Sequence, residues 1–257
     1  MPFYSFFKGI FTQKTTYYYQ RKVVKKNMLI VVAKPEDEAE FFLPVIDYMK
    51  RFNHIYILAI SNGSQDGNGK QKEKEFAASC KLLGIEDYAV YDEPDLQFGE
   101  KEFWESDRVA DVITKHLTSR QGEGEIDFII TYDANGQTYH PNRMAVHRGI
   151  SKVFEDRKFT LDVMTLRTVG KCKRYSAYFD CQNVMYDTMN YFKIFPNAAI
   201  KARGCYSTSN KSRNILKAIF CRYTYLNDLE HFTHTPEKYG EKKKEEVKQS
   251  DQKEIKE

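Results

Sequence analysis

The chain has 257 residues, 41% of them hydrophobic, and is long enough for one large domain with a buried core. Its net charge of +4 is uneven: residues 1–35 carry +7 without a single Asp or Glu, whereas residues 236–257 are neutral. The body between them carries −3, which excludes a general basic surface and argues against nucleic-acid binding.

The cysteines are isolated from one another and form no C-x-x-C pair. They are Cys80, Cys172, Cys181, Cys205 and Cys221. An odd number of widely spaced cysteines is typical of a reducing compartment, and argues against both a disulfide scaffold and a thiolate zinc site. We expect buried free thiols.

Residues 1–26 form a basic, aromatic N-terminal arm or leader whose apolar runs are too short to span a bilayer. Three interpretations stay open. The absence of acidic residues fits a mitochondrial import signal. Aromatic residues among lysines fit contact with a membrane surface or with phosphoinositides. The segment also fits an arm packed on the domain or on a partner.

Strand and helix patterns alternate along residues 27–235, which we predict to be one domain. The expected strands are Asn27–Ala33, His54–Ser61, Tyr88–Tyr91, Ile126–Thr131 and Asp162–Arg167. The expected helices are Glu38–Arg51, Lys70–Leu83, Trp104–Leu117 and one that begins at Pro141. This alternation predicts an α/β fold with a Rossmann-like, mostly parallel sheet flanked by helices.

Two C-terminal segments have other patterns. The stretch Ile215–Tyr223 is expected to be a helix that packs into the core, with a membrane helix as the alternative. The tail, residues 236–257, is charged and has too few apolar residues to pack, so we expect it to be disordered or a solvated helix.

Polar residues follow the first and fourth strands that we expect in the sheet. They lie in Lys34–Glu38 and in Asp133–Arg143. Because open parallel sheets bind ligands outside the carboxyl ends of their strands, both segments should face one crevice.

Four sequence blocks, in order from residue 28 to residue 227, resemble a known family. They are Met28-Leu-Ile-Val-Val-Ala-Lys-Pro-Glu-Asp-Glu38, Ser61-Asn-Gly-Ser-Gln-Asp-Gly-Asn-Gly69, Thr131-Tyr-Asp-Ala-Asn-Gly-Gln-Thr-Tyr-His-Pro-Asn-Arg143 and Cys221-Arg-Tyr-Thr-Tyr-Leu-Asn227. They are similar to segments of the zinc-dependent N-acetylglucosaminyl-phosphatidylinositol de-N-acetylase family (PIG-L, LmbE-like). The resemblance implies an LmbE-like deacetylase fold for residues 27–235. It also implies that the protein resides at the cytosolic face of the endoplasmic reticulum. The N-terminus suggests the mitochondrion as an alternative.

Residues at several of the family's catalytic positions are retained. In that family, two histidines and an aspartate hold Zn²⁺, a neighbouring carboxylate acts as general base and a further histidine stabilises the oxyanion. By position, Asp37 matches the carboxylate ligand, Glu36 the general base and His140 the oxyanion histidine, while Asn142 keeps its place.

The histidines that the resemblance assigns to zinc are replaced. Lys34 and Arg143 stand at the two ligand positions, and Tyr206 stands at a further histidine of the family. A protonated ammonium has no lone pair for zinc, and an arginine stays charged in proteins. We therefore expect no bound cofactor, although the family uses zinc.

Two interpretations of the substituted crevice remain. Lys34 and Arg143 bring two positive charges to the place of Zn²⁺, which predicts an ion-pair cluster with the neighbouring carboxylates. Alternatively, Lys34, Arg143 and His140 form a pocket for a phosphate or a phosphoinositide headgroup. The crevice is expected to be lined by Lys34, Glu38, Asp133, Asn142, Arg143 and Tyr206.

The sequence favours a catalytically degenerate homologue that acts as a structural or regulatory subunit of a larger assembly with protein partners. The first alternative is an active zinc-dependent de-N-acetylase in GPI-anchor biosynthesis. The second is a module that binds phosphoinositides or sugars.

Overall fold

A computed structural model describes residues 24–64, 67–85, 87–122, 124–155, 159, 161–176, 189–192 and 196–232. The predictions for residues 1–23 and for the tail, residues 236–257, lie outside these ranges. Two of the four cysteines described as free, Cys80 and Cys221, are buried, as expected, whereas Cys172 is exposed.

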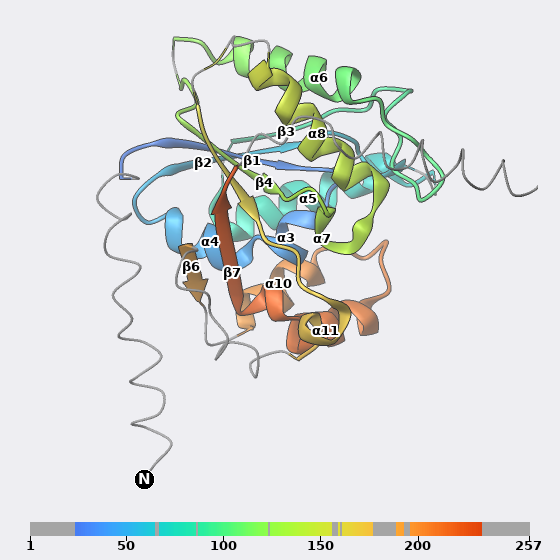
Figure 1. The fold of residues 1–257 in the computed structure, drawn as a ribbon. Coiled ribbons are helices and arrows are strands. Elements are labelled where there is room, and N and C mark those ends of the chain that lie inside the picture. Colours follow the sequence, from blue (N-terminus) through green and yellow to red (C-terminus); the bar gives the residue numbers. More distant parts are fainter. Residues whose placement is uncertain are drawn as a thin grey trace, which may run out of the picture.

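The strands within the described ranges form one sheet in the order β3-β2-β1-β4-β5-β7-β6 (Figure 1). They are β1 (Asn27–Val32), β2 (His54–Ala59), β3 (Asp87–Val90), β4 (Phe128–Tyr132), β5 (Asp162–Leu166), β6 (Met189–Phe192) and β7 (Leu226–His231). Strands β1 to β5 are parallel, and β7 runs antiparallel to β5 and β6. The predicted α/β class and mostly parallel sheet are confirmed.

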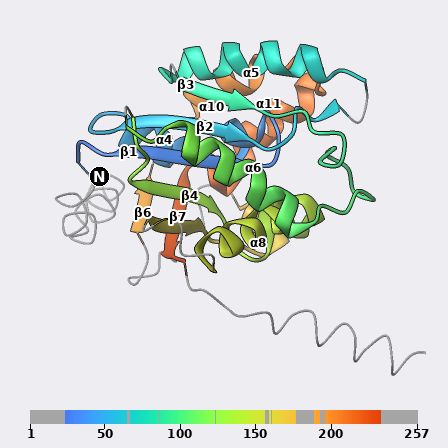
Figure 2. The ribbon, with the colours of Figure 1, turned by 90° about the horizontal axis from the view of Figure 1, so that it is seen from above.

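Helices cover both faces of this sheet (Figures 1 and 2). They are α3 (Asp37–Phe41), α4 (Leu43–Met49), α5 (Gly69–Leu83), α6 (Ser106–Ser119), α7 (Gly136–Tyr139), α8 (Pro141–Glu155), α9 (Lys171–Arg174), α10 (Asn197–Gly204), α11 (Lys211–Phe220) and the 3₁₀ helix η3 (Arg222–Thr224). Helices α6 and α8 lie on one face, and α3, α4, α5 and α10 lie on the other.

The expected helix Glu38–Arg51 is wrong as a single element, because the structure breaks it into α3 and α4 at Phe42. Pro44 causes the break: it has no amide hydrogen for a helical bond, and its ring disfavours helical backbone at the preceding residue. The break leaves α3 as a short helix after β1, with Asp37 as its first residue.

The central strand β1 has no exposure to solvent from Met28 to Val32, which explains its uninterrupted apolar sequence. It lies between β2 and β4, where the order of the strands along the chain reverses. Such a reversal opens a crevice at the carboxyl ends of the two strands on either side. The loops after Val32 and Tyr132 therefore start at the same edge of the sheet.

The prediction that Ile215–Tyr223 is one helix packed into the core is wrong in part, because α11 ends at Phe220 and only Ala218, Cys221 and Tyr223 among its apolar side chains are buried. Ala218 is fully buried, but Ile215, Leu216, Ile219 and Phe220 are 46%, 55%, 37% and 50% exposed. The helical period exists, but its large apolar face points outward. No helix of the described part is long and apolar enough to cross a bilayer.

Candidate functional site

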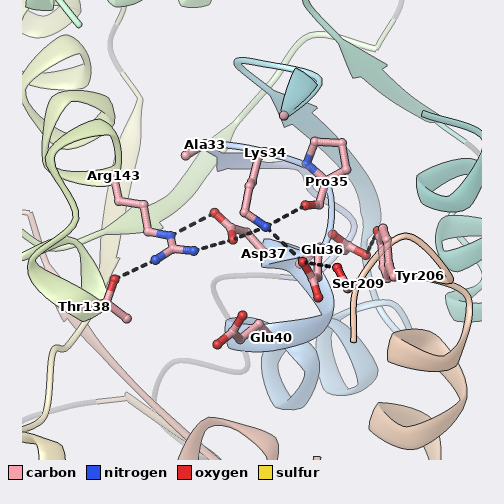
Figure 3. Close-up of polar contacts among 12 residues, drawn as sticks. Ala33, Lys34, Pro35, Glu36, Asp37, Glu40, Thr138, Arg143, Tyr206 and Ser209 are labelled. Atoms are coloured by element: carbon pink, nitrogen blue, oxygen red, sulfur yellow. Dashed lines mark hydrogen bonds and ion pairs between the residues drawn. The ribbon is translucent and has the colours of Figure 1, made fainter. Parts of the chain in front are cut away.

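The carboxylate of Asp37 lies at the centre of a cluster of polar contacts (Figure 3), and it is completely buried. Arg143 approaches it with two parallel hydrogen bonds, from Nε to Oδ2 at 3.0 Å and from Nη2 to Oδ1 at 2.7 Å. The hydroxyl of Tyr132 donates to Oδ2 at 2.7 Å. Both oxygens of Asp37 are thus engaged by donors from α8 and from the end of β4.

The guanidinium of Arg143 is enclosed as well. Its Nη1 donates to Oγ1 of Thr138 at 2.6 Å, and its planar group lies 4.7 Å from the ring centroid of Phe41 and 5.7 Å from that of Phe98. Arginine suits such a position because its planar charge bonds to a carboxylate and stacks on aromatic faces. Arg143 therefore forms a buried ion pair with Asp37 in which each guanidinium nitrogen donates a hydrogen bond.

Lys34 adds a second, largely buried cation to the cluster. Its Nζ donates to Oε2 of Glu36 at 3.0 Å and to the carbonyl oxygen of Pro35 at 3.2 Å. The same nitrogen lies 3.7 Å from Oδ1 of Asp37. The contact that the ion-pair interpretation requires is present for both cations.

The charges in this cluster stabilise one another. Burial alone would raise the pKa of Asp37, but the charges of Arg143 and Lys34 outweigh it and lower that pKa to about 2. Burial likewise opposes the charged form of Lys34, yet Glu36 and Asp37 raise the pKa of its ammonium. Asp37, Lys34 and Arg143 are therefore all charged at neutral pH.

Glu36 has a backbone conformation that L residues rarely adopt, with φ at 88° and ψ at −28°. Such a conformation costs on the order of 1–3 kcal/mol and is most often found at functional sites. Here it directs the side chain to Lys34 and to Ser209, whose Oγ donates to Oε2 at 3.1 Å. The position predicted for a general base is thus held by a cation and a hydroxyl.

Glu38 and Tyr206 form a separate buried pair rather than an open crevice wall. Tyr206 and Ser79 donate to Oε1 of Glu38 at 2.5 and 2.7 Å, while Oε2 is buried without a hydrogen-bond partner. Burial, opposed by these two bonds, raises the pKa of Glu38 to about 7. The tyrosine at the family's histidine position therefore supports a buried carboxyl.

His140 lies flat on Phe98, with ring centroids 4.3 Å apart and an angle of 16° between the rings. Its Nδ1 accepts the backbone N–H of Asn142 at 3.3 Å. Burial and the nearby charge of Arg143 lower its pKa to about 4, so the ring is neutral at pH 7. Asn142 itself accepts from the amide of Gly99 and donates to the carbonyl of Glu102, so it fixes that loop to α8.

Asp133 connects the end of β4 to the loop after β5. It accepts hydrogen bonds from the backbone and the hydroxyl of Thr168 at 2.7 and 2.6 Å, and from the amide of Asn135 at 3.1 Å. The carboxylate of Asp133 is thus turned toward the loop after β5, and its place in the crevice stays a prediction. It positions the segment that leads to His140 and Arg143.

These residues do not fit a zinc ion. Zinc needs lone pairs from three or four converging ligands, and here both oxygens of Asp37 already accept hydrogen bonds. The positions beside it are cationic, and His140 is stacked on Phe98. Within the described residues, no group of three or more His, Cys, Asp and Glu side chains is placed to hold a metal.

Sequence reasoning missed several members of the cluster, namely Phe98, Tyr132, Thr138 and Ser209. Tyr132 had a usable signal, since it ends an apolar strand at the point where the chain order reverses. Phe98 comes from a loop without periodicity, and no pattern links it to Lys34, Arg143 or His140. Its contacts depend on the tertiary fold alone.

A family model for GlcNAc-PI de-N-acetylase (PIG-L) matches residues 29–154. The chain is 32% identical over 152 residues to a probable N-acetylglucosaminyl-phosphatidylinositol de-N-acetylase of Schizosaccharomyces pombe, covering 58% of this chain and 59% of that protein. It is 28% identical over 212 residues to the Bos taurus enzyme of that name, covering 77% and 80%. The chain thus spans less than two thirds of the S. pombe relative.

Solved structures share the fold at low sequence identity. The N,N′-diacetylchitobiose deacetylase of Pyrococcus horikoshii aligns over 92% of this chain and 97% of its own, with a TM-score of 0.57 and 14% identity. A conserved protein of Thermus thermophilus aligns over 82% and 96%, with a TM-score of 0.51 and 15% identity. These likenesses establish an LmbE-like architecture.

Proposed function

The chain belongs to the N-acetylglucosaminyl-phosphatidylinositol de-N-acetylase family, and we propose that it is a non-hydrolytic member that serves as a structural or regulatory subunit of a larger assembly. The family includes zinc-dependent deacetylases. The observation that carries the proposal is the bidentate contact of Arg143 with Asp37, the carboxylate that matches the family's metal ligand.

The energetics of this contact support the proposal. For Asp37 to bind a metal, it would have to leave Arg143 and Tyr132, and the guanidinium would remain buried without its counter-ion. Removing one partner from a buried ion pair lowers the free energy of unfolding by about 3–5 kcal/mol. A divalent cation would also lie close to both Arg143 and Lys34, which repel it. The cluster keeps the crevice in shape without a hydrolytic centre.

The two alternative functions have less support from the geometry. An active zinc enzyme would need ligands that Lys34 and Arg143 do not supply. A phosphate in the crevice would have to compete with Glu36 and Asp37, which already bind the two cations. The similarity to the S. pombe and B. taurus proteins favours the endoplasmic reticulum as the compartment. It does not support the mitochondrial alternative.

One purification tests both parts of the proposal. The full chain, isolated under native conditions from its own cells, is expected to migrate well above its mass of 30.2 kDa. The same fraction is expected to release no acetate from N-acetylglucosaminyl-phosphatidylinositol beyond the rate of an Asp37→Asn variant. Migration as a free monomer would contradict the subunit role, and turnover that Asp37→Asn abolishes would contradict the non-hydrolytic assignment.

A further inference from the structure

Helix α11 (Lys211–Phe220) exposes its largest apolar side chains. Ile215, Leu216, Ile219 and Phe220 are each between 37% and 55% exposed. At about 100° per residue these four side chains cover an arc of roughly 140° on one side of the helix. A contiguous apolar face of this kind marks an interaction surface more often than scattered apolar residues do.

The inner face of α11 is the less apolar of the two. Asn214 and Ala218, which are 3% and 0% exposed, point into the protein on the side opposite the apolar arc. If protein packing alone governed the sequence of this helix, the large side chains would be expected on the inner face. The outward position of Leu216 and Phe220 therefore indicates an apolar environment outside the described chain.

The helix itself is firmly held. The side chain of Asn210 caps its start by accepting the amide of Arg213 at 3.0 Å. Lys217 forms an ion pair with Glu40 of α3 at 2.7 Å, and the hydroxyl of Tyr225 donates to the carbonyl of Ile219. Figure 1 shows α11 at the outer edge of the molecule, beyond α10. The apolar arc is thus a fixed surface feature.

The chain segment that contains α11 carries charges of one sign, although Lys217 is paired with Glu40 of α3. Residues 196–227 contain six Lys and Arg residues and no Asp or Glu, although the body of the chain is net negative. Arg203 and Arg222 are buried, whereas Lys201 and Arg213 are exposed. Apolar side chains flanked by exposed cations are typical of helices that lie in the interface of an anionic bilayer.

We propose that α11 docks this protein on an anionic phospholipid surface, with Ile215, Leu216, Ile219 and Phe220 inserted at the level of the headgroups. The exposed parts of four side chains make up only part of the about 800 Å² that each partner of a stable protein–protein interface buries. A bilayer needs no such area and no shape complementarity. Ser209, which contacts Glu36, precedes the cap of α11, so docking would hold the crevice near the lipid surface.

Flotation of the full chain with vesicles tests this surface. Phosphatidylcholine vesicles that contain about 30% phosphatidylserine should bind the protein, while pure phosphatidylcholine vesicles and about 0.5 M salt should weaken binding. The double variant Leu216→Ser/Phe220→Ser should reduce the bound fraction about tenfold or more. Phe103→Ser is the matched control, because Phe103 is 73% exposed far along the chain from α11 and should leave binding unchanged.

Each other outcome overturns the proposal. Absence of binding by the unmodified chain would exclude a lipid surface, and equal binding by the double variant would assign the contact to another segment. A lower melting temperature of the double variant would show that the chain covers α11 itself. A dimer that dissociates in the double variant would identify a second copy as the occupant, and retention of a protein ligand without vesicle binding would identify a protein partner.

Discussion

Replacing Arg143 with Ala should lower the free energy of unfolding by about 3–5 kcal/mol near neutral pH, because it removes the bidentate partner of the buried Asp37 carboxylate and leaves Lys34, 3.7 Å away, as the remaining cation beside it. Asp37 has no exposed surface. Its two carboxylate oxygens accept two hydrogen bonds from Arg143 and one from Tyr132. Chemical denaturation monitored by circular dichroism measures the loss.

Lys152→Ala provides the matched control for this prediction. Lys152 lies on the same helix, α8, and pairs with Asp107 at 2.8 Å, but Asp107 is 77% exposed. Exposed pairs contribute at most about 1 kcal/mol, so this variant should stay close to the unmodified protein. An equal loss of unfolding free energy in the two variants would show that the buried pair of Arg143 and Asp37 contributes no more to stability than an exposed pair.

The loss caused by Arg143→Ala should depend on pH. In the unmodified protein the pKa of Asp37 is lowered to about 2 from the ordinary value of 3.8. Its stabilising effect is therefore complete above that ordinary value and is lost as the pH falls toward 2. Without Arg143, Lys34 and Tyr132 alone oppose the effect of burial, so the pKa of Asp37 should be higher than in the unmodified protein and acid should neutralise the carboxylate. The difference between variant and unmodified protein should shrink from about pH 7 to about pH 4, whereas a loss independent of pH would point to packing.

The double substitution Lys34→His/Arg143→His should create a zinc site. It frees Asp37 from its two cations and places an imidazole at each position that the family resemblance assigns to a ligand. Zinc bound by elemental analysis should rise to about one equivalent per chain, and zinc should raise the melting temperature of this variant.

The triple variant that adds Asp37→Asn is the control for this gain, because it keeps both imidazoles and removes the carboxylate. It should bind far less zinc than the double variant. If the double variant folds but takes up no zinc, the assignment of Lys34 and Arg143 to the ligand positions is incorrect.

The order of strands and helices in the first part of the sheet could be predicted because each has a clear period and clear ends. The apolar run of β1 and the glycine after α5 both set their elements within a few residues. The break at Phe42 was not anticipated, since the period of apolar residues continues across it. Pro44 was the available signal, because it lies at the start of α4.

The site was predictable only in part, for a physical reason. The approach of Asp37 to Arg143 follows from strand order and could be expected from the loops after β1 and β4. The orientation of the Asp133 side chain could not be predicted, because it depends on a hydrogen bond with Thr168 in another loop. The outward face of α11 was also missed, since helical periodicity shows that a helix has an apolar face but not which way that face points.

The zinc content of the unmodified protein tests the central claim most directly, with zinc supplied during expression and elemental analysis after purification. Because Arg143 and Tyr132 engage both oxygens of Asp37, less than about a tenth of an equivalent per chain is expected. About one equivalent per chain, lost in Asp37→Asn, would contradict the account and restore a metal-dependent hydrolase as the function of this crevice.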